Sequence, residues 1–118
     1  MTKELKNELA ALGADVQGGL HICMDMEELY DTLVKMFVSD KSFEQMVAAT
    51  NRADYEGAYE YAHALKGITL NIGFTHLSEP LIALMEGMRN SESKKVDELM
   101  KPFVEQYIRT SNIIKSMI

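Results

Sequence analysis

His63 and Lys66 lie three residues apart in an apolar, helix-forming segment, and Gly67 follows directly. A neutral imidazole nitrogen can act as a nucleophile near neutral pH. A lysine ammonium can hold the negative charge of a transferred phosphoryl group. In the interior of a helix, glycine lowers stability by about 1 kcal/mol relative to alanine. The presence of Gly67 therefore calls for an explanation, and the natural one is that it leaves the approach to His63 open. The combination indicates an accessible site for an anionic group.

A helical wheel predicts where this site points. With about 100° per residue and Ala58 at zero, the apolar stripe lies within roughly 40° of zero. This stripe consists of Ala58, Ala62, Leu65, Thr69 and Ile72. His63 falls at about 140° on the same wheel, so we expect its ring to face outward or to sit at a rim. Tyr59, Glu56 and Leu70 fall on the His63 side.

The source of a phosphoryl group would have to be another protein. The sequence has no glycine-rich phosphate loop, kinase signature or nucleotide-binding fingerprint. Phosphoryl transfer depends mostly on positioning and charge neutralisation, so a protein that only accepts and donates the group needs little more than the residues above.

Length and charge narrow the function classes. The 118 residues suit one domain, 1–118, with its own core. The net charge of -6 and the absence of a basic patch argue against nucleic acid as a partner. No apolar run reaches the ~20 residues of a membrane span. The chain is expected to be monomeric.

Compartment signals point to the cytoplasm. Cys23 is the single cysteine, so no intrachain disulfide can form, and a reducing compartment fits best. The N-terminal segment is charged and lacks the apolar stretch of a secretory signal. Met1 favours a free-standing protein over an excised domain.

Apolar residues at helical spacing dominate the whole chain. We expect helices over about 3–12, 28–38, 40–50, 54–73, 77–88 and 93–114, with a short helical turn over about 15–24. Short connections imply antiparallel neighbours. The sequence therefore predicts an all-α fold, an antiparallel up-and-down four-helix bundle with an N-terminal helical extension.

Local signals mark several helix ends. Asp15 and Asp54 are suited to cap the helices that follow them, and Asp25 with Glu28 looks like a variant capping box. Pro102 lies inside the last helix, where we expect a kink or a break. Leu29 is expected on an inward face, and so is either Cys23 or Met24.

At these residues the chain resembles the histidine-containing phosphotransfer (HPt) domain of multistep two-component phosphorelays. The family pattern runs His-x-Leu-Lys-Gly, then small residues, an aliphatic residue and a glycine. The segment "HALKGITLNIG" supplies this pattern from His63 to Gly73. Upstream, residues 13–40 resemble the helical lead-in of the family, so the likeness covers almost the whole chain.

The resemblance implies a role for each residue of the motif. His63 would carry the phosphoryl group, Lys66 would stabilise its charge, and Gly67 would keep the approach open. A receiver domain of a hybrid histidine kinase would donate from an aspartyl phosphate, and the receiver of a response regulator would accept. The protein would have no autokinase activity and no cofactor, since Mg²⁺ would belong to the receiver.

Two residues depart from the family pattern. Ile68 and Leu70 stand where small residues are usual, and Leu70 shares the His63 side. We expect Tyr59, Leu70 and Glu56 to contact the partner. The segment Val16–Met24 is expected to complete the docking surface, and Leu70 to tune the choice of partner.

Two other function classes compete with this interpretation. Glu60 and His63 have the Glu-x-x-His spacing of carboxylate-bridged di-iron bundles, but the wheel points both outward, and the pair His76 and Glu79 has the reverse order. No metal site is therefore expected. A pure interaction module, with Tyr59, Leu70 and nine methionines as an adaptable face, is the other alternative, and it would need His63 to be dispensable.

Overall fold

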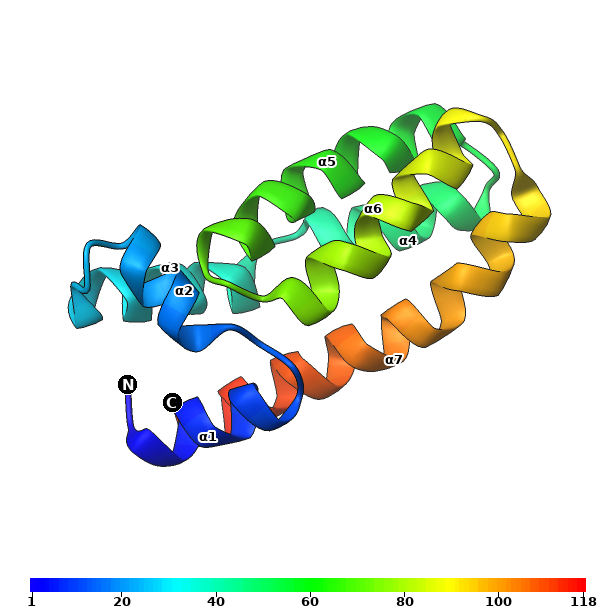
Figure 1. Cartoon of the computed structure of the whole chain (residues 1–118). Coiled ribbons are helices and arrows are strands. Elements are labelled where there is room, and N and C mark those ends of the chain that lie inside the picture. The colour runs from blue at the N-terminus through cyan, green and yellow to red at the C-terminus, as the bar shows by residue number, and fades with distance from the viewer.

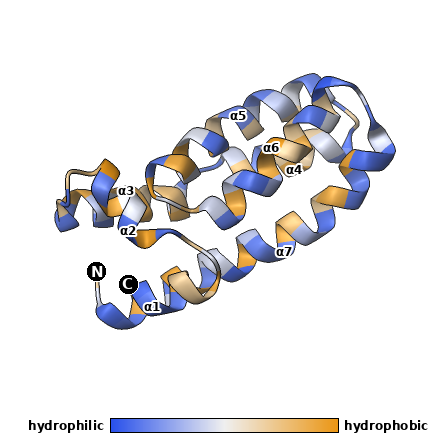
Figure 2. Cartoon of the chain, in the orientation of Figure 1, coloured by the Kyte–Doolittle hydropathy of each residue, from blue (hydrophilic) through white to orange (hydrophobic).

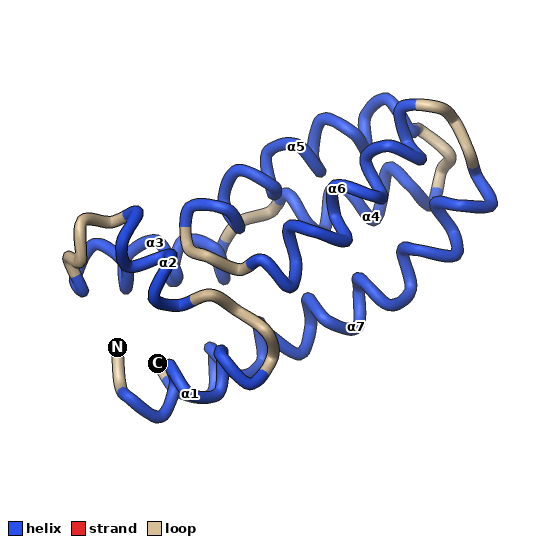
Figure 3. The backbone as a smooth tube through the Cα atoms, in the orientation of Figure 1, coloured by secondary structure: helices blue, strands red, loops and turns tan.

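All regular structure in the chain is helical. The computed structural model describes residues 1–118, and Figure 3 shows helices joined by loops without a strand. The helices are α1 (Lys3–Ala11), α2 (Val16–Ile22), α3 (Glu27–Ser39), α4 (Ser42–Asn51), α5 (Tyr55–Asn71), α6 (Thr75–Arg89) and α7 (Ser93–Met117). The prediction of an all-α fold is confirmed.

Helices that follow one another in the second half of the chain pack together. α4 contacts α5, α5 contacts α6, and α6 contacts α7. α7 is 25 residues long, and its C-terminal part runs beside α1, so the two chain ends lie close together (Figure 1). α2 and α3 both contact α5. Hydrophobic and hydrophilic residues alternate around α7 in Figure 2, as expected of a helix with one buried side.

The core contains the stripe that the wheel predicts for α5. Its members are fully buried: Ala58, Ala62, Leu65, Thr69 and Ile72. Apolar residues at helical spacing on α6 are buried as well: Leu77, Leu81, Leu84, Met85 and Met88. These two helices therefore turn their opposite sides to the surface.

Aspartate side chains begin α2 and α5, as predicted. Asp15 accepts a hydrogen bond from the backbone N–H of Gly18, and Asp54 accepts one from that of Gly57, each at 2.9 Å. Such a cap satisfies one of the free N–H groups of a first helical turn and contributes about 1 kcal/mol. Asp54 thus fixes where the helix that carries His63 begins.

The C-terminal end of α5 is held by α2 and α3. Gly73 has a φ of 71°, and a Cβ there would collide with the carbonyl oxygen of Asp15. The N–H of Asp15 donates to the carbonyl of Gly73 at 2.7 Å. Because only glycine combines this backbone angle with so close an approach, Gly73 is required for the junction between α2 and α5.

The start of α3 differs from the prediction. Met26, not Asp25, occupies the N-cap position, and it makes no side-chain capping bond. Met24 and Asp25 both have positive φ, 55° and 59°, so the chain turns sharply there and the Asp25–Glu28 capping box does not form. Leu29, expected on an inward face, is exposed, whereas of the alternatives Cys23 and Met24 the cysteine is buried and the methionine is exposed.

Proline does not interrupt either helix that contains it. Pro102 lies within α7, which continues from Ser93 to Met117, so of the predicted kink or break the break does not occur. Pro80 is the sixth residue of α6, which begins at Thr75. Both prolines lie outside the fully buried core. No helix of the chain combines the length and the apolar character needed to cross a membrane.

Candidate functional site

His63 lies in the middle of α5 and is exposed. The exposure that the wheel predicts is therefore confirmed. Both neighbouring turns of the helix are intact, and the residues on the opposite side of α5 are anchored in the core. The imidazole is thus presented to solvent from a rigid support, which suits a group that must meet a partner in a defined position.

The space beyond His63 on the helix is open. A Cβ built on Gly67 would find no atom of another element within 4 Å. Gly67 is exposed, and Lys66 is half-buried on the turn between them. Packing against other elements therefore does not require a glycine at this position.

Tyr59 flanks His63 on the other side, one turn earlier in α5. The two rings are nearly parallel, with an interplanar angle of 13° and centroids 6.5 Å apart. This geometry lies within the range of offset aromatic stacking. Tyr59 is half-buried and packs against the core, whereas His63 is not part of the core.

Arg89, at the end of α6, contacts Tyr59 and was not identified from the sequence. Its Nη2 donates to the Tyr59 hydroxyl at 3.2 Å, and its Cζ lies 5.6 Å from the centroid of the ring. The hydrogen bond raises the pKa of the Arg89 guanidinium. No sequence signal links the two residues, because only the antiparallel packing of α5 on α6 brings them together.

A shallow depression of about 390 Å³ lies beside this contact. Its lining includes Glu56, Glu60, Tyr59 and Arg89. The depression places two exposed carboxylates and one guanidinium near the first half of α5. Glu56, predicted to contact a partner, is thus available at the surface.

Of the remaining residues predicted for docking, some are exposed and others are buried. Leu70 is 42% exposed, large and apolar, and it lies two turns beyond His63. In the segment Val16–Met24, the side chains of Val16 and Leu20 are buried, whereas Ile22 and Met24 are exposed. The segment therefore offers a partner only its exposed side chains, which are Gln17, His21, Ile22 and Met24.

Ile68, the other departure from the family pattern, is half-buried and packs against the core. It lines a separate depression together with Leu33 and Met36 of α3. Its larger side chain therefore borders a depression whose lining does not include His63.

The other two histidines have different surroundings. His21 is exposed on α2. His76 is half-buried, and burial lowers its pKa to about 4. Its Nε2 lies 2.9 Å from the hydroxyl oxygen of Thr110, which itself donates to the carbonyl of Gln106. His76 therefore donates to Thr110 from Nε2, and it is held in the neutral form near pH 7.

Metal-binding residues do not converge in the structure. No group of three or more His, Cys, Asp and Glu side chains is placed to hold an ion. Glu60 and His63 are both exposed on α5, where no carboxylate from another helix faces them as a di-iron site would require. Cys23 is buried and free.

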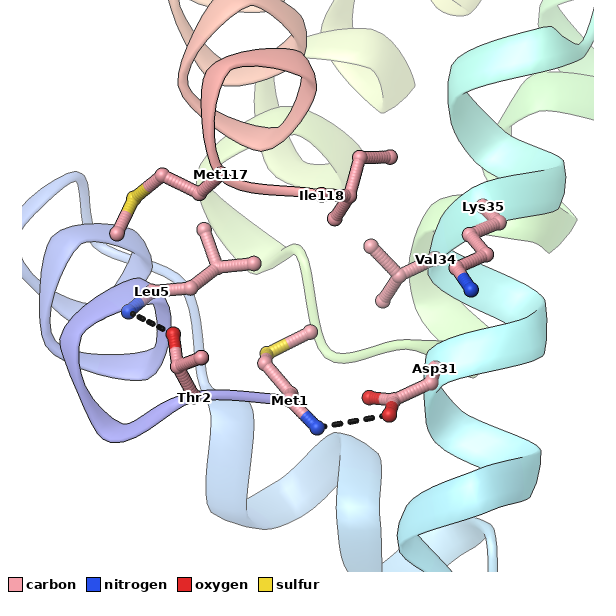
Figure 4. A pocket seen from close by; sticks show the side chains of 8 residues that line it. All are labelled: Met1, Thr2, Leu5, Asp31, Val34, Lys35, Met117 and Ile118. Carbon is pink, nitrogen blue, oxygen red and sulfur yellow. Dashed lines mark hydrogen bonds and ion pairs between the residues drawn. The ribbon is translucent and has the colours of Figure 1, made fainter.

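A cavity of about 460 Å³ lies apart from His63, between α1, α3 and the end of α7 (Figure 4). Its walls are mainly apolar, from Leu5, Val34 and Met117 among others. The N-terminal ammonium donates to the Asp31 carboxylate at its edge, at 2.7 Å. None of its lining residues belongs to α5, so it plays no part in the candidate site.

No protein-family description, curated protein or solved structure matches the chain.

Proposed function

We propose that the chain is a histidine phosphotransfer protein of the HPt class. His63 accepts a phosphoryl group from the aspartyl phosphate of one receiver domain and passes it to the aspartate of another. The observation that carries this proposal is the exposed imidazole in the middle of α5, with open space over Gly67 and the Lys66 ammonium one turn away. No other exposed histidine of the chain has a comparable setting.

The transfer step needs only the imidazole and a docked partner. The lone pair of the unprotonated ring nitrogen of His63 forms the N–P bond. The P–O bond to the receiver's aspartate breaks, and its electron pair stays on the carboxylate. The proton on the other ring nitrogen remains in place during this step. Lys66 offsets the charge of the phosphoryl oxygens, and Mg²⁺ enters with the receiver.

The arrangement of the helices fits this role. In this proposal α4 to α7 form the up-and-down four-helix bundle, and α1 to α3 form its N-terminal extension. The packing of α4 on α5, α5 on α6 and α6 on α7 supports it. The protein acts in the cytoplasm as a monomeric carrier between the receiver of a hybrid histidine kinase and that of a response regulator, without autokinase activity.

A labelling experiment tests the proposal. The protein is mixed with a panel of receiver domains that carry radioactive aspartyl phosphate, and the label that moves to it is tested for stability. Acid-labile, alkali-stable label on the wild type and none on His63→Gln is the expected result. His21→Gln is the matched control, because His21 is also exposed on a helix, and it should label like the wild type.

Two outcomes would overturn the proposal. Label that persists in His63→Gln would place the acceptor elsewhere. Receivers that bind the wild type tightly and transfer nothing would identify an interaction module in which His63 is dispensable.

A further inference from the structure

Three side chains from two helices form a continuous series beside the candidate site. Arg89 of α6 bonds the hydroxyl of Tyr59, and the ring of Tyr59 lies parallel to that of His63 on α5. We propose that Tyr59, held by Arg89, is a positioning residue that fixes the orientation of the His63 imidazole for phosphoryl transfer. The inference rests on the proposed function of His63, and it assigns Tyr59 a role other than partner contact.

Helical geometry explains why Tyr59 can act on His63. Side chains on a helix lean toward its N-terminus, over the residue one turn earlier. For His63 that residue is Tyr59, and the parallel rings 6.5 Å apart show the lean. On the other side, Gly67 offers no side chain that could limit the imidazole. Tyr59 is therefore the aromatic side chain on α5 that lies against the ring one turn earlier.

Tyr59 is itself held in place. It packs against the core, its hydroxyl accepts from Arg89, and the guanidinium lies close to its ring. A surface tyrosine without such contacts would exchange between rotamers and would limit its neighbour little. The contact from α6 therefore restricts the rotamers of Tyr59 and holds its ring beside the imidazole.

A fixed imidazole reacts faster because it does not have to lose rotamer freedom in the transition state. This effect does not depend on which molecule donates the phosphoryl group. A docking contact would behave differently, because it speeds transfer only from a donor that it touches. Leu70, exposed and with no bond to another element, suits the docking role better than Tyr59 does.

A donor without a docking surface separates the two roles. Phosphoramidate is such a donor: a His63 nitrogen forms the N–P bond, the P–N bond of the donor breaks, and ammonia leaves with the electron pair. Labelling rates are measured with phosphoramidate and with a receiver, for the wild type, Tyr59→Phe, Tyr59→Leu and Arg89→Met. Tyr55→Leu is the matched control, since Tyr55 is also half-buried on α5 and packs against the core.

We expect Tyr59→Leu to slow labelling by both donors equally, by about threefold to tenfold. Tyr59→Phe, which keeps the ring, should retain most of the rate, and Arg89→Met should fall between them. NMR couplings of His63 should show one dominant side-chain rotamer in the wild type and averaging in Tyr59→Leu. Tyr55→Leu should match the wild type in both measurements.

Other results would overturn the inference. A loss with the receiver alone would make Tyr59 a docking contact, and unchanged rates with unchanged couplings would leave it no role. If neither donor labels the wild type, the proposed function fails, and the NMR couplings still decide whether Tyr59 orients the ring. Arg89→Met changes an exposed residue, so it tests the inference even if Tyr59→Leu does not fold.

Discussion

The hydroxyl of Tyr30 donates a buried hydrogen bond of 2.8 Å to the backbone carbonyl of Ile72. This bond joins α3 to the residue that caps the C-terminal end of α5. Burial raises the pKa of the Tyr30 hydroxyl, so it remains a donor over the whole accessible pH range. The helix that carries His63 is thereby fixed to α3.

Tyr30→Phe should lower the free energy of unfolding by about 1 to 3 kcal/mol, because it leaves the Ile72 carbonyl buried without a donor. Chemical denaturation measures the change. Tyr61→Phe removes a hydroxyl that makes no hydrogen bond, and it should change stability little. Equal losses in the two variants would show that the bond itself contributes nothing.

His76 should make stability depend on pH. Its pKa is about 4 in the folded chain and near 6.5 when exposed, so the unfolded chain binds the proton more readily between these values. The free energy of unfolding therefore rises with pH from about 4 to 6.5 and falls on acidification, by at most about 3 kcal/mol from this residue.

Thermal unfolding of His76→Gln across this range measures the contribution of His76. The glutamine amide can still donate to Thr110, so the fold should survive while the dependence on pH weakens. His21→Gln, at an exposed site, should keep the dependence of the wild type. If the dependence of the unfolding free energy on pH is the same in His76→Gln as in the wild type, that dependence comes from the carboxylates and not from His76.

Two substitutions of Gly67 test separately its effect on helix stability and its effect on access to His63. Gly67→Ala should raise the free energy of unfolding by about 1 kcal/mol, since the added Cβ meets open space and alanine favours the helix. Gly67→Leu should fold equally well and slow phosphoryl transfer, because its side chain would reach toward His63 one turn earlier. Transfer that is as fast in Gly67→Leu as in the wild type would refute a role in access.

Lys66→Ala should slow transfer without abolishing it, whereas His63→Gln should abolish it with the fold intact. Lysine only neutralises charge, and the loss of one such contact costs a few kcal/mol of barrier at most. Single-turnover rates with one receiver, checked by circular dichroism of each variant, measure the difference. A complete loss in Lys66→Ala would show that the lysine takes part in the bond-making step.

Leu70→Ala tests the docking surface. As an anchor, Leu70 should contribute to binding, and its loss should weaken transfer from the cognate receiver. If its bulk instead excludes wrong partners, transfer from non-cognate receivers should rise. Rates against a panel of receivers distinguish these outcomes, and no change with any of them would place the docking surface elsewhere.

Periodicity in the sequence was sufficient to predict the buried stripe of α5 and the exposure of His63. Both follow from local geometry, because the spacing of the apolar residues along a helix determines which of its sides is buried. The caps at Asp15 and Asp54 were predictable for the same reason, because each aspartate bonds a backbone group three residues on.

Features that depend on contacts between distant residues were not predictable. Arg89 meets Tyr59 only after α5 and α6 pack, and a wheel drawn for one helix cannot show this. Leu29 is exposed because Tyr30, Val34 and Phe37 form the buried side of α3, which begins just after a left-handed turn at Met24 and Asp25. Pro102 was expected to kink or break α7; it does not break the helix, and it lies on the exposed side.

The bond between Tyr30 and Ile72 also bears on the order in which the chain can assemble. It spans 42 positions of sequence, whereas α4 to α7 contact their chain neighbours across short turns. Loop-closure entropy grows with the logarithm of loop length, so closing the longer loop costs about 2 kcal/mol more than closing a turn of a few residues. Docking of α2 and α3 onto α5 is thus the entropically costlier step. The contacts of α2 and α3 with α5, at the end of the helix that carries His63, offset that cost.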